Sequence, residues 1–314
     1  MKILAVMVLY QTPLTDSETI RGLCEAFRSR PELAESYQIV VWDNSPEPLL
    51  NVDLPIPFVY RHSQYNAGVS GAYNSAMRHA LECGCEWMLL LDQDTAVTAE
   101  FLSTMQRHCS EVDRRGQVAA IAPTVRVRDV VVSPRKQLFN HHGSYPLGES
   151  GIAEGEAFAI NSGCLMRVRA LEAIGGFSVD FWLDYSDMYV FHQFFLGGLK
   201  VWRVADAELE HDLSVMDYDR LMTPGRYRNF SSAESAFHDL YKGRLENAVQ
   251  NLRLLARAIK QRRKYKNPEF SRIAWRQLVY RLTVPRKQRI ARWRQEGEQR
   301  RKQSQQIAGE TAPV

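Results

Sequence analysis

Short apolar runs of strand length alternate with segments of helical pattern through the first 125 residues of this 314-residue chain. The pattern predicts strands at residues 3–9, 38–42, 58–61, 87–91 and 118–124, and helices at residues 19–28, 71–82 and 99–112. Strands and helices that alternate in this way form a mostly parallel sheet with helices on both faces. The chain is therefore predicted to have an α/β fold.

Polar and acidic residues directly follow three of the expected strands. They are Gln11 and Thr12 after the first strand, Asp43, Asn44 and Ser45 after the second, and Asp92, Gln93, Asp94 and Thr95 after the fourth. Ligands of open α/β sheets bind beyond the carboxyl ends of the strands. We therefore expect these three clusters to converge on one site.

The first apolar run also has the character of a signal-peptide core. It is followed by Gln11, Thr12 and Pro13 rather than by the small residues of a cleavage site. A buried parallel strand is apolar throughout, so we expect a strand. The five cysteines include one close pair, Cys83 and Cys85, which is too close for an ordinary disulfide. Reduced thiols, and hence a cytoplasmic protein, are expected.

Beyond residue 125 the alternation ends, and residues 126–230 are expected to build the second substrate's side of the cleft. Apolar residues at three- and four-residue spacing predict helices at about 233–263 and 273–282. Pro268 precedes the second helix and Pro285 interrupts the pattern after it. From residue 299 the chain is polar and lacks periodicity, and a disordered tail is expected over 299–314.

Asp92 and Asp94 are the strongest local signal for chemistry. Two carboxylates one residue apart must lie in a turn if both are to reach one ligand. Mg²⁺ and Mn²⁺ prefer oxygen ligands and commonly bridge to phosphates. The alternative is a solvated turn whose aspartates cap the helix that begins at Ala99. Because polar clusters end three strands, we favour a metal site.

Two further segments are suited to a nucleotide. The carboxylate of Asp43 is able to accept the imide N–H of a uracil or thymine base. Residues 66–74 contain small side chains that let a backbone approach a nucleotide closely, although they form neither a Walker loop nor a G-x-G-x-x-G fingerprint.

These motifs resemble the inverting nucleotide-sugar glycosyltransferases of family 2, which have the GT-A fold, over residues 1–230. The matching segments are 9–12, 41–45, 66–74, 91–95, 162–167, 175–177 and 181–187. The resemblance implies a Rossmann-like mixed sheet flanked by helices, with the nucleotide sugar bound by residues 1–125 and the acceptor by residues 126–230. Within the family, the Asp-Gln-Asp motif and the Leu183-Asp184-Tyr185-x-Asp187 segment look most like bacterial rhamnosyltransferases that use dTDP-L-rhamnose.

The resemblance also implies roles for individual residues. Asp43 would contact the pyrimidine base, and Tyr10 and Thr12 would line the base and ribose pocket. Asp94 would be the principal ligand of Mg²⁺ or Mn²⁺, with Asp92, near the ribose and diphosphate, and His211 completing the site. The other implied donor contacts are Asn66, Gly71, Asn74, Gln93, Arg226 and Arg228; for the two arginines an exposed basic loop is the alternative.

Asp187 aligns with the catalytic base, which removes a proton from the acceptor hydroxyl as its oxygen attacks the anomeric carbon. Asp184 lies three residues earlier, on the same face if the segment is helical, and is the alternative base or a helix cap. Trp182, Asp184 and Tyr185 are the implied acceptor contacts. The implied acceptor is a bacterial surface polysaccharide of the O-antigen or capsule type, either free or lipid-linked.

The net charge of +4 is unevenly distributed along the chain. Residues 1–250 contain 22 Lys and Arg against 32 Asp and Glu, whereas residues 251–314 contain 18 against 4. The basic segment, a predicted helical extension over 231–298, is interleaved with apolar residues. Its basic members from Arg276 onward are Arg276, Arg281, Arg286, Lys287, Arg289, Arg292 and Arg294. This composition favours an anionic membrane surface and a peripheral location at the inner face of the cytoplasmic membrane; the alternative is packing on the acidic body or a partner subunit.

Three other functions fit parts of this pattern. A nucleotidyltransferase shares the architecture, but residues 11–16 lack the Gly-rich, basic phosphate loop that such enzymes normally have. A non-catalytic nucleotide-sugar binder would not need Asp94 and Asp187. A basic tail attracts any polyanion, yet a nucleic-acid partner is not expected because it would leave the acidic motifs unexplained.

Overall fold

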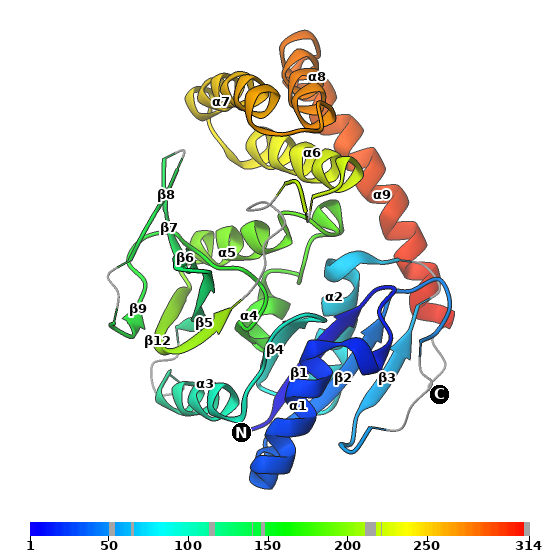
Figure 1. Ribbon diagram of the computed structural model, residues 1–314, viewed down its shortest axis with the longest axis vertical. Coiled ribbons are helices and arrows are strands. Elements are labelled where there is room, and N and C mark those ends of the chain that lie inside the picture. Colours follow the sequence, from blue (N-terminus) through cyan, green and yellow to red (C-terminus); the bar gives the residue numbers. More distant parts are fainter. Residues whose placement is uncertain are drawn as a thin grey trace.

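A sheet of nine strands forms the centre of the computed structural model, which describes residues 1–49, 54–63, 66–112, 117–139, 141–145, 148–210, 218–220 and 222–310. Eight strands lie in the order β3-β2-β1-β4-β11-β5-β12-β9, and β6 pairs with β5 (Figure 1). Their bounds are β1 Ile3–Leu9, β2 Tyr37–Asp43, β3 Val59–His62, β4 Trp87–Asp92, β5 Val118–Val127, β6 Val130–Ser133, β9 Gly151–Ile152, β11 Leu165–Arg167 and β12 Lys200–Glu210. A small second sheet contains β7 Arg135–Leu138, β8 His141–Gly143 and β10 Ala157–Phe158.

Strands β3, β2, β1 and β4 are parallel, as the sequence predicts. Strand β1 is paired so that Leu9 lies beside Asp43 of β2 and Val8 lies beside Asp92 of β4. This register brings the carboxyl ends of the three strands to the same edge. Strand β11 runs antiparallel between β4 and β5, and β12 is parallel to β5, so the sheet as a whole is mixed.

Helices cover both faces of the sheet, which explains why β1 is apolar along its whole length. Ile3, Met7 and the other odd-numbered residues of β1 pack in one core cluster with α1 Glu18–Ser29 and α3 Ala99–Val112. Leu4, Val6 and Val8 pack in a second cluster with α2 Gly68–Glu82, α4 Val168–Ala173 and α5 Ser186–Leu196. The run that resembled a signal-peptide core is thus a central strand. All five cysteines are free thiols.

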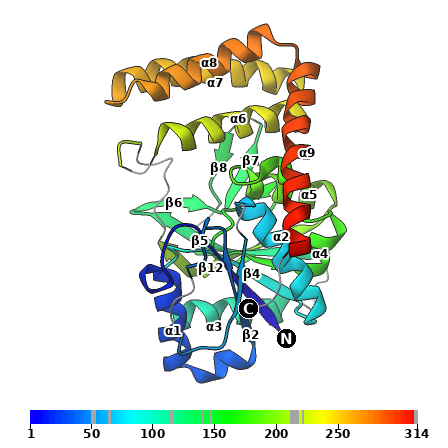
Figure 2. The same cartoon turned by 90° about the vertical axis from the view of Figure 1, so that its right-hand side faces the viewer.

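In the described residues after β12, four helices follow the sheet: α6 Pro224–Tyr241, α7 Arg244–Lys264, α8 Glu269–Thr283 and α9 Arg286–Glu310. Pro268 and Pro285 lie at the predicted breaks. Helices α7 and α8 form a hairpin beyond α6 at one end of the long axis, and α9 returns along the body towards the sheet domain (Figures 1 and 2). No helix in the described part of the chain is both long and apolar enough to cross a membrane.

Two predicted boundaries differ from the structure. Helix α6 continues through residues 230 and 231, where the catalytic part was expected to end. Helix α9 continues past residue 299 as far as Glu310, where a disordered tail was expected. Before residue 299, α9 packs on the 3₁₀ turn η4, Val179–Phe181: the ring of Trp293 lies 5.9 Å from that of Phe181. Gly297 lies so close to Asp180 that a Cβ would collide with its carboxylate.

Candidate active site

The loops after β1, β2 and β4 are tied together at the carboxyl edge of the sheet. The backbone N–H of Tyr10 donates to Gln93 Oε1 at 2.9 Å, and that of Gln11 donates to Ser45 Oγ at 2.8 Å. Gln11 has a positive φ of 53°, which turns the chain sharply after β1. The predicted convergence of the three polar clusters is thereby confirmed, and Gln93 acts as a link between loops.

Tyr10 and Thr12 lie on the open side of these linked loops. The side chain of Tyr10 is 43% exposed. The hydroxyl of Thr12 donates to the carbonyl of Tyr10 at 3.4 Å. An exposed aromatic ring at this edge is suited to stacking on a nucleotide base.

Asp43 is fully buried and holds the loop that follows β2. Its Oδ1 accepts a hydrogen bond from the backbone N–H of Ser45 at 2.8 Å. Its Oδ2 accepts from the hydroxyl of Tyr60 at 2.6 Å and from the backbone N–H of Leu49 at 2.9 Å. The carboxylate with the implied base contact is therefore occupied by its own chain, and a base would reach it only after this loop rearranged.

The acidic motif after β4 lies in a turn, and its aspartates do not cap the next helix. Asp92 is partly buried and Asp94 is exposed. Helix α3 is capped instead by Thr98, whose Oγ1 accepts from the backbone N–H of Phe101 at 3.1 Å. The turn is fastened by Thr95, whose hydroxyl accepts from the N–H of Asp92 and lies 2.6 Å from the hydroxyl of Ser162. The capping alternative for Asp92 and Asp94 is therefore wrong.

Small side chains in residues 66–74 allow a close contact within the chain, whereas the predicted approach of a nucleotide stays a prediction. Gly68 has a φ of +65°, and a Cβ there would lie 2.1 Å from the carbonyl oxygen of Trp182. Ser70 fastens the same segment, because its hydroxyl donates to the carbonyl of Phe181 at 2.7 Å. The small side chains thus let α2 approach residues 181–182 of this chain.

Asn66, Gly71 and Asn74 likewise make contacts within the chain. Asn66 Oδ1 accepts from the N–H of Gly68 at 2.9 Å, and a Cβ at Gly71 would collide with the Cβ of Ala67. The side-chain amide of Asn74 bonds both the N–H and the carbonyl of Phe177, each at 2.8 Å. These contacts hold the segment in shape, and the predicted role of the three residues in donor binding stays a prediction.

Asp187 lies in the first turn of α5, after Tyr185 in a left-handed conformation with φ 67°. Burial, together with the nearby charges of Asp184 and Asp92, raises the pKa of Asp187 to about 6. The hydrogen bond from the N–H of Met188, 2.7 Å long, opposes this rise. Asp92 of β4 and Asp187 of α5 therefore face one site. A carboxyl group with this pKa has the properties of a general base.

Asp184 forms an ion pair with an arginine of helix α6. Its side chain is only 7% exposed, and Oδ1 lies 3.1 Å from the guanidinium of Arg226 in α6. Burial raises the pKa of Asp184, whereas Arg226 lowers it. Oδ2 of Asp184 is buried without a hydrogen-bond partner among the described residues. Asp184 does not cap α5, whose N-cap position is Tyr185.

The remaining implied contacts divide into those near the site and those turned away. Trp182 is partly buried against Gly68. The ring of Tyr185 packs 5.6 Å from the rings of both Phe230 and Phe237 and so fastens α5 to α6. Arg228 is exposed, and its charge helps to lower the pKa of Glu269 in α8. Of the two predicted arginines, Arg226 therefore reaches the site and Arg228 faces the helical hairpin.

Tyr73 is a residue of this site that sequence analysis did not single out. It is fully buried in α2, and its hydroxyl has no hydrogen-bond partner in the described part of the structure. Burial, followed by the charges of Asp92 and Asp187, raises its pKa well above the ordinary value. The only feature of the sequence that indicates a place for Tyr73 at this site is its position within residues 66–74.

Asp92 and Asp94 supply the hard oxygen ligands that Mg²⁺ or Mn²⁺ prefers. His211 lies outside the described residues. Among the residues that are described, no group of three or more His, Cys, Asp or Glu side chains is arranged to hold a metal ion. Mg²⁺ is commonly held by one or two carboxylates together with substrate phosphates, and the two aspartates fit that donor set.

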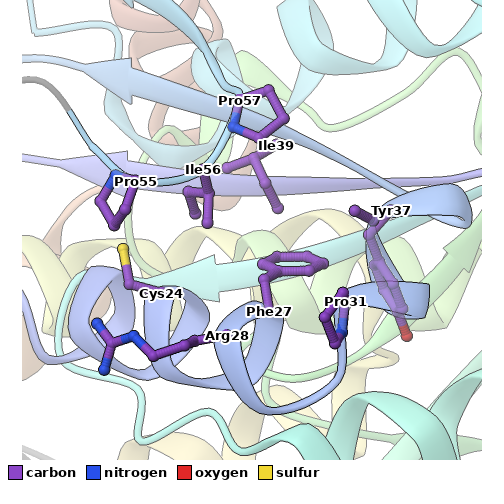
Figure 3. A pocket seen from close by; sticks show the side chains of 10 residues that line it. Cys24, Phe27, Arg28, Pro31, Tyr37, Ile39, Pro55, Ile56 and Pro57 are labelled. Atoms are coloured by element: carbon purple, nitrogen blue, oxygen red, sulfur yellow. The ribbon is translucent and has the colours of Figure 1, made fainter.

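An apolar cavity of about 240 Å³ lies elsewhere, between α1 and the amino-terminal half of β2 (Figure 3). Phe27, Ile39 and Ile56 line it, and Arg28 is the charged residue among its described lining. Tyr37, which also lines the cavity, pairs with Ile3 at the end of the sheet opposite the acidic residues. The cavity is therefore separate from the candidate active site.

A mixed sheet flanked by helices, with acidic residues at the carboxyl ends of its parallel strands, is the architecture expected of a GT-A glycosyltransferase. The chain belongs to glycosyl transferase family 2, whose family model matches residues 8–175. The expected fold class is thereby confirmed.

Individual relatives match parts of the chain. Galactofuranosyltransferase GlfT1 of Mycolicibacterium smegmatis is 31% identical over 114 residues, which cover 30% of this chain and 38% of that protein. Among solved structures, S. aureus TarS 1-349 matches with a TM-score of 0.53 and 12% identity, over 90% of this chain and 81% of TarS. The complex of TarS 1-349 with UDP-GlcNAc matches with a TM-score of 0.49 and 14% identity, over 91% and 82% of the two chains. The TarS match concerns the fold, including its helical carboxyl-terminal region.

Proposed function

We propose that the protein is a metal-dependent inverting glycosyltransferase that transfers L-rhamnose from dTDP-L-rhamnose to a hydroxyl of a surface-polysaccharide acceptor. The observation that carries the proposal is the convergence of three polar strand ends, Asp92 and Asp94 among them, at one edge of the sheet. The charge of Asp92 contributes to the raised pKa of Asp187, about 6, which supports a position of this carboxyl group at the same site. Membership of family 2 supports transfer from a nucleotide sugar. The acceptor is a glycan, either free or lipid-linked.

Asp187 acts as the general base in this proposal. An alcohol is a poor nucleophile near neutral pH, and a positioned base contributes about 10²- to 10⁴-fold in rate. With a pKa of about 6, Asp187 is ionised at pH 7 yet binds a proton more tightly than an ordinary aspartate. It takes the proton of the acceptor hydroxyl, whose oxygen attacks the anomeric carbon from the side opposite the diphosphate.

Asp94 is the principal metal ligand in this proposal, with Asp92 and His211 as the other protein ligands. A bound Mg²⁺ or Mn²⁺ would neutralise charge on the departing diphosphate. Asp94 is exposed at the turn after β4, where a diphosphate has access to it. Asp184 is an acceptor contact in this proposal, and its ion pair with Arg226 links that side of the site to α6.

Rhamnose as the transferred sugar rests on the Asp-Gln-Asp motif and on residues 183–187. The match to a galactofuranosyltransferase favours a second candidate, a different sugar such as galactofuranose, carried on UDP, dTDP or GDP. Because uracil and thymine offer the same imide N–H, the base contact does not separate these donors.

A donor panel tests the proposal directly. Release of nucleoside diphosphate is measured with dTDP-L-rhamnose, several UDP-sugars and several GDP-sugars, in the presence of Mg²⁺ or Mn²⁺. We expect the highest turnover with dTDP-L-rhamnose, and Asp187→Asn should abolish turnover while preserving donor-induced thermal stabilisation. Asp129→Asn, at an exposed turn, is the matched control. Preference for a UDP-sugar would replace rhamnose, and near-normal turnover of Asp187→Asn would exclude this residue as the base.

A further inference from the structure

The outward face of the α7–α8 hairpin exposes two lines of large apolar side chains. Leu245, Leu252 and Ile259 form the line on α7, and Leu252 is 66% exposed. Trp275, Val279 and Leu282 form the line on α8, and Leu282 is also 66% exposed. Spacings of seven residues on α7, and of four and three on α8, place each set on one side of its helix. These six residues are called the hairpin face below.

The hairpin face points away from the rest of the protein. The buried side of α7 contains Leu254 and Ala258, and that of α8 contains Phe270, Ile273 and Ala274. Those sides pack on each other and on α6. The hairpin lies beyond α6 at the end of the molecule's long axis (Figures 1 and 2). The apolar lines therefore have no covering element in the described structure.

Cationic side chains surround the hairpin face. Residues 244–284 contain 11 Lys and Arg but only two acidic residues, Glu246 and Glu269. Glu246 accepts from the N–H of Gly243, and Glu269 is paired with Arg272. The exposed basic residues of α7 and α8 are Arg244, Arg253, Lys260, Arg262, Arg263, Lys264, Arg272 and Arg276.

A shallow hollow on α7 brings the two kinds of side chain together. It is lined by Ala256, Ile259, Lys260, Arg263 and Lys264. Ammonium and guanidinium groups beside an aliphatic side chain suit a phosphate headgroup attached to hydrocarbon.

Much of the remaining basic segment is used inside the protein. Arg281 is buried and bonds Asn247 at 2.6 Å, and it lies 3.3 Å from Asp239. Arg289 forms a two-pronged pair with the same carboxylate, both bonds being 2.7 Å long. Arg286 donates to the carbonyl of Asp239. For these three arginines the structure supports packing on the body. Lys287, Arg292 and Arg294 of α9 are exposed as well, but the exposed basic residues on the same two helices as the apolar lines are those of α7 and α8.

We propose that the hairpin face docks on the surface of an anionic phospholipid bilayer. Interfacial helices insert an apolar side between the lipids, and flanking Lys and Arg residues meet the anionic headgroups. A second copy of this chain fits less well, because a two-fold contact would press two cationic faces together. Nucleic acid also fits less well, because the centre of the face is mainly aliphatic rather than a row of stacking aromatic rings.

Docking in this manner relates the bilayer to the candidate active site. Helix α6 lies beneath the hairpin, and near its amino terminus is Arg226, which contacts Asp184. Helix α6 therefore lies between the hairpin face and the acceptor side of the site. The docking inference does not depend on which sugar is transferred.

Vesicle flotation tests the inference with the full chain. The vesicles contain phosphatidylcholine alone or phosphatidylcholine with phosphatidylglycerol. We expect the wild-type protein to float with the anionic vesicles only, and less strongly at about 1 M salt, where the Debye length falls to about 3 Å. The variant with Leu252→Gln, Trp275→Gln and Leu282→Gln should bind at least about tenfold more weakly, because three apolar side chains no longer enter the lipid.

Two further variants and one second measurement make the test decisive. Phe139→Gln, Ile152→Gln and Leu196→Gln replace three exposed apolar residues outside the hairpin and should leave flotation unchanged. Lys260→Gln, Arg263→Gln and Lys264→Gln should weaken binding to anionic vesicles without changing the apolar lines. Equal flotation of the wild type and the Leu252, Trp275, Leu282 variant would overturn the inference. So would a wild-type dimer in light scattering that this variant converts to monomer while neither protein floats.

Discussion

Replacing the proposed base should make the protein more stable as it makes it inactive. Asp187→Asn preserves the shape of the side chain and an oxygen that accepts from the N–H of Met188. It removes a negative charge that is partly buried and that faces Asp184 and Asp92. Such a charge lowers the free energy of unfolding of the wild-type protein, so removing it should stabilise the fold.

The magnitude follows from the pKa of Asp187, about 6 in the folded protein against 3.8 for the ordinary side chain. The folded state therefore binds the proton more tightly than the unfolded state, and stability falls as pH rises between these two values. Each pH unit of that difference corresponds to about 1.4 kcal/mol, so the ionised carboxylate destabilises the fold by about 3 kcal/mol at pH 7. Below about pH 4 the carboxyl group is neutral in both states, and the effect disappears.

Calorimetric or fluorescence-monitored melting from pH 4 to pH 7.5 is the assay. The unfolding entropy of a 314-residue chain is about 0.7 kcal/mol/K. At pH 7 we therefore expect the Tm of Asp187→Asn to exceed that of the wild type by about 4 °C. The difference should shrink as pH falls through the interval between 6 and 4. Asp129→Asn, at an exposed turn, should show no such pH-dependent difference. A constant Tm difference across the pH range, or a lower Tm at pH 7, would refute this account of the Asp187 pKa.

Three other changes have expected outcomes. Asp184→Asn removes a charge that raises the pKa of Asp187, so the acid limb of the kcat/KM profile should move to lower pH by less than about one unit; an unchanged limb would contradict the coupling. Gly297→Val should push α9 away from Asp180 and lower turnover with little change in donor affinity, measured by titration calorimetry, whereas Gly151→Ala, where a Cβ meets open space, serves as a control for activity. EDTA should suppress turnover reversibly and Asp94→Asn should prevent its recovery by Mg²⁺ or Mn²⁺; full activity without divalent metal would remove the role given to Asp94.

The carboxyl edge of the sheet was predictable because two signals agree there. Strands buried on both faces are continuously apolar, so β1, β2 and β4 are visible as short runs in the sequence. Each run ends where polar residues begin, which marks the point at which the chain leaves the core. Since parallel strands share one edge for their carboxyl ends, three local patterns were enough to predict one site.

The partners of the polar residues at that edge were not predictable in the same way. Asp43 has a carboxylate suited to a base, but the donors that occupy it come from Leu49 and from Tyr60 on the next strand. Asn74 has an amide suited to a sugar, but its partner is Phe177, 103 residues further along the chain. Residue type and strand position give the neighbourhood of a side chain, whereas its hydrogen-bond partners depend on distant segments.

The acidic residues before residue 250 and the basic residues after it do not form two separate charged surfaces, because some of them pair with each other. Glu234 in α6 forms a largely buried two-pronged pair with Arg257 of the basic segment, through bonds of 2.6 and 2.7 Å. Asp239 is enclosed in the same way by Arg281 and Arg289. These pairs join the carboxyl-terminal helices to α6, because removing one partner of a buried pair leaves an uncompensated charge. The basic residues that can contact an external partner are therefore those on the exposed sides of these helices.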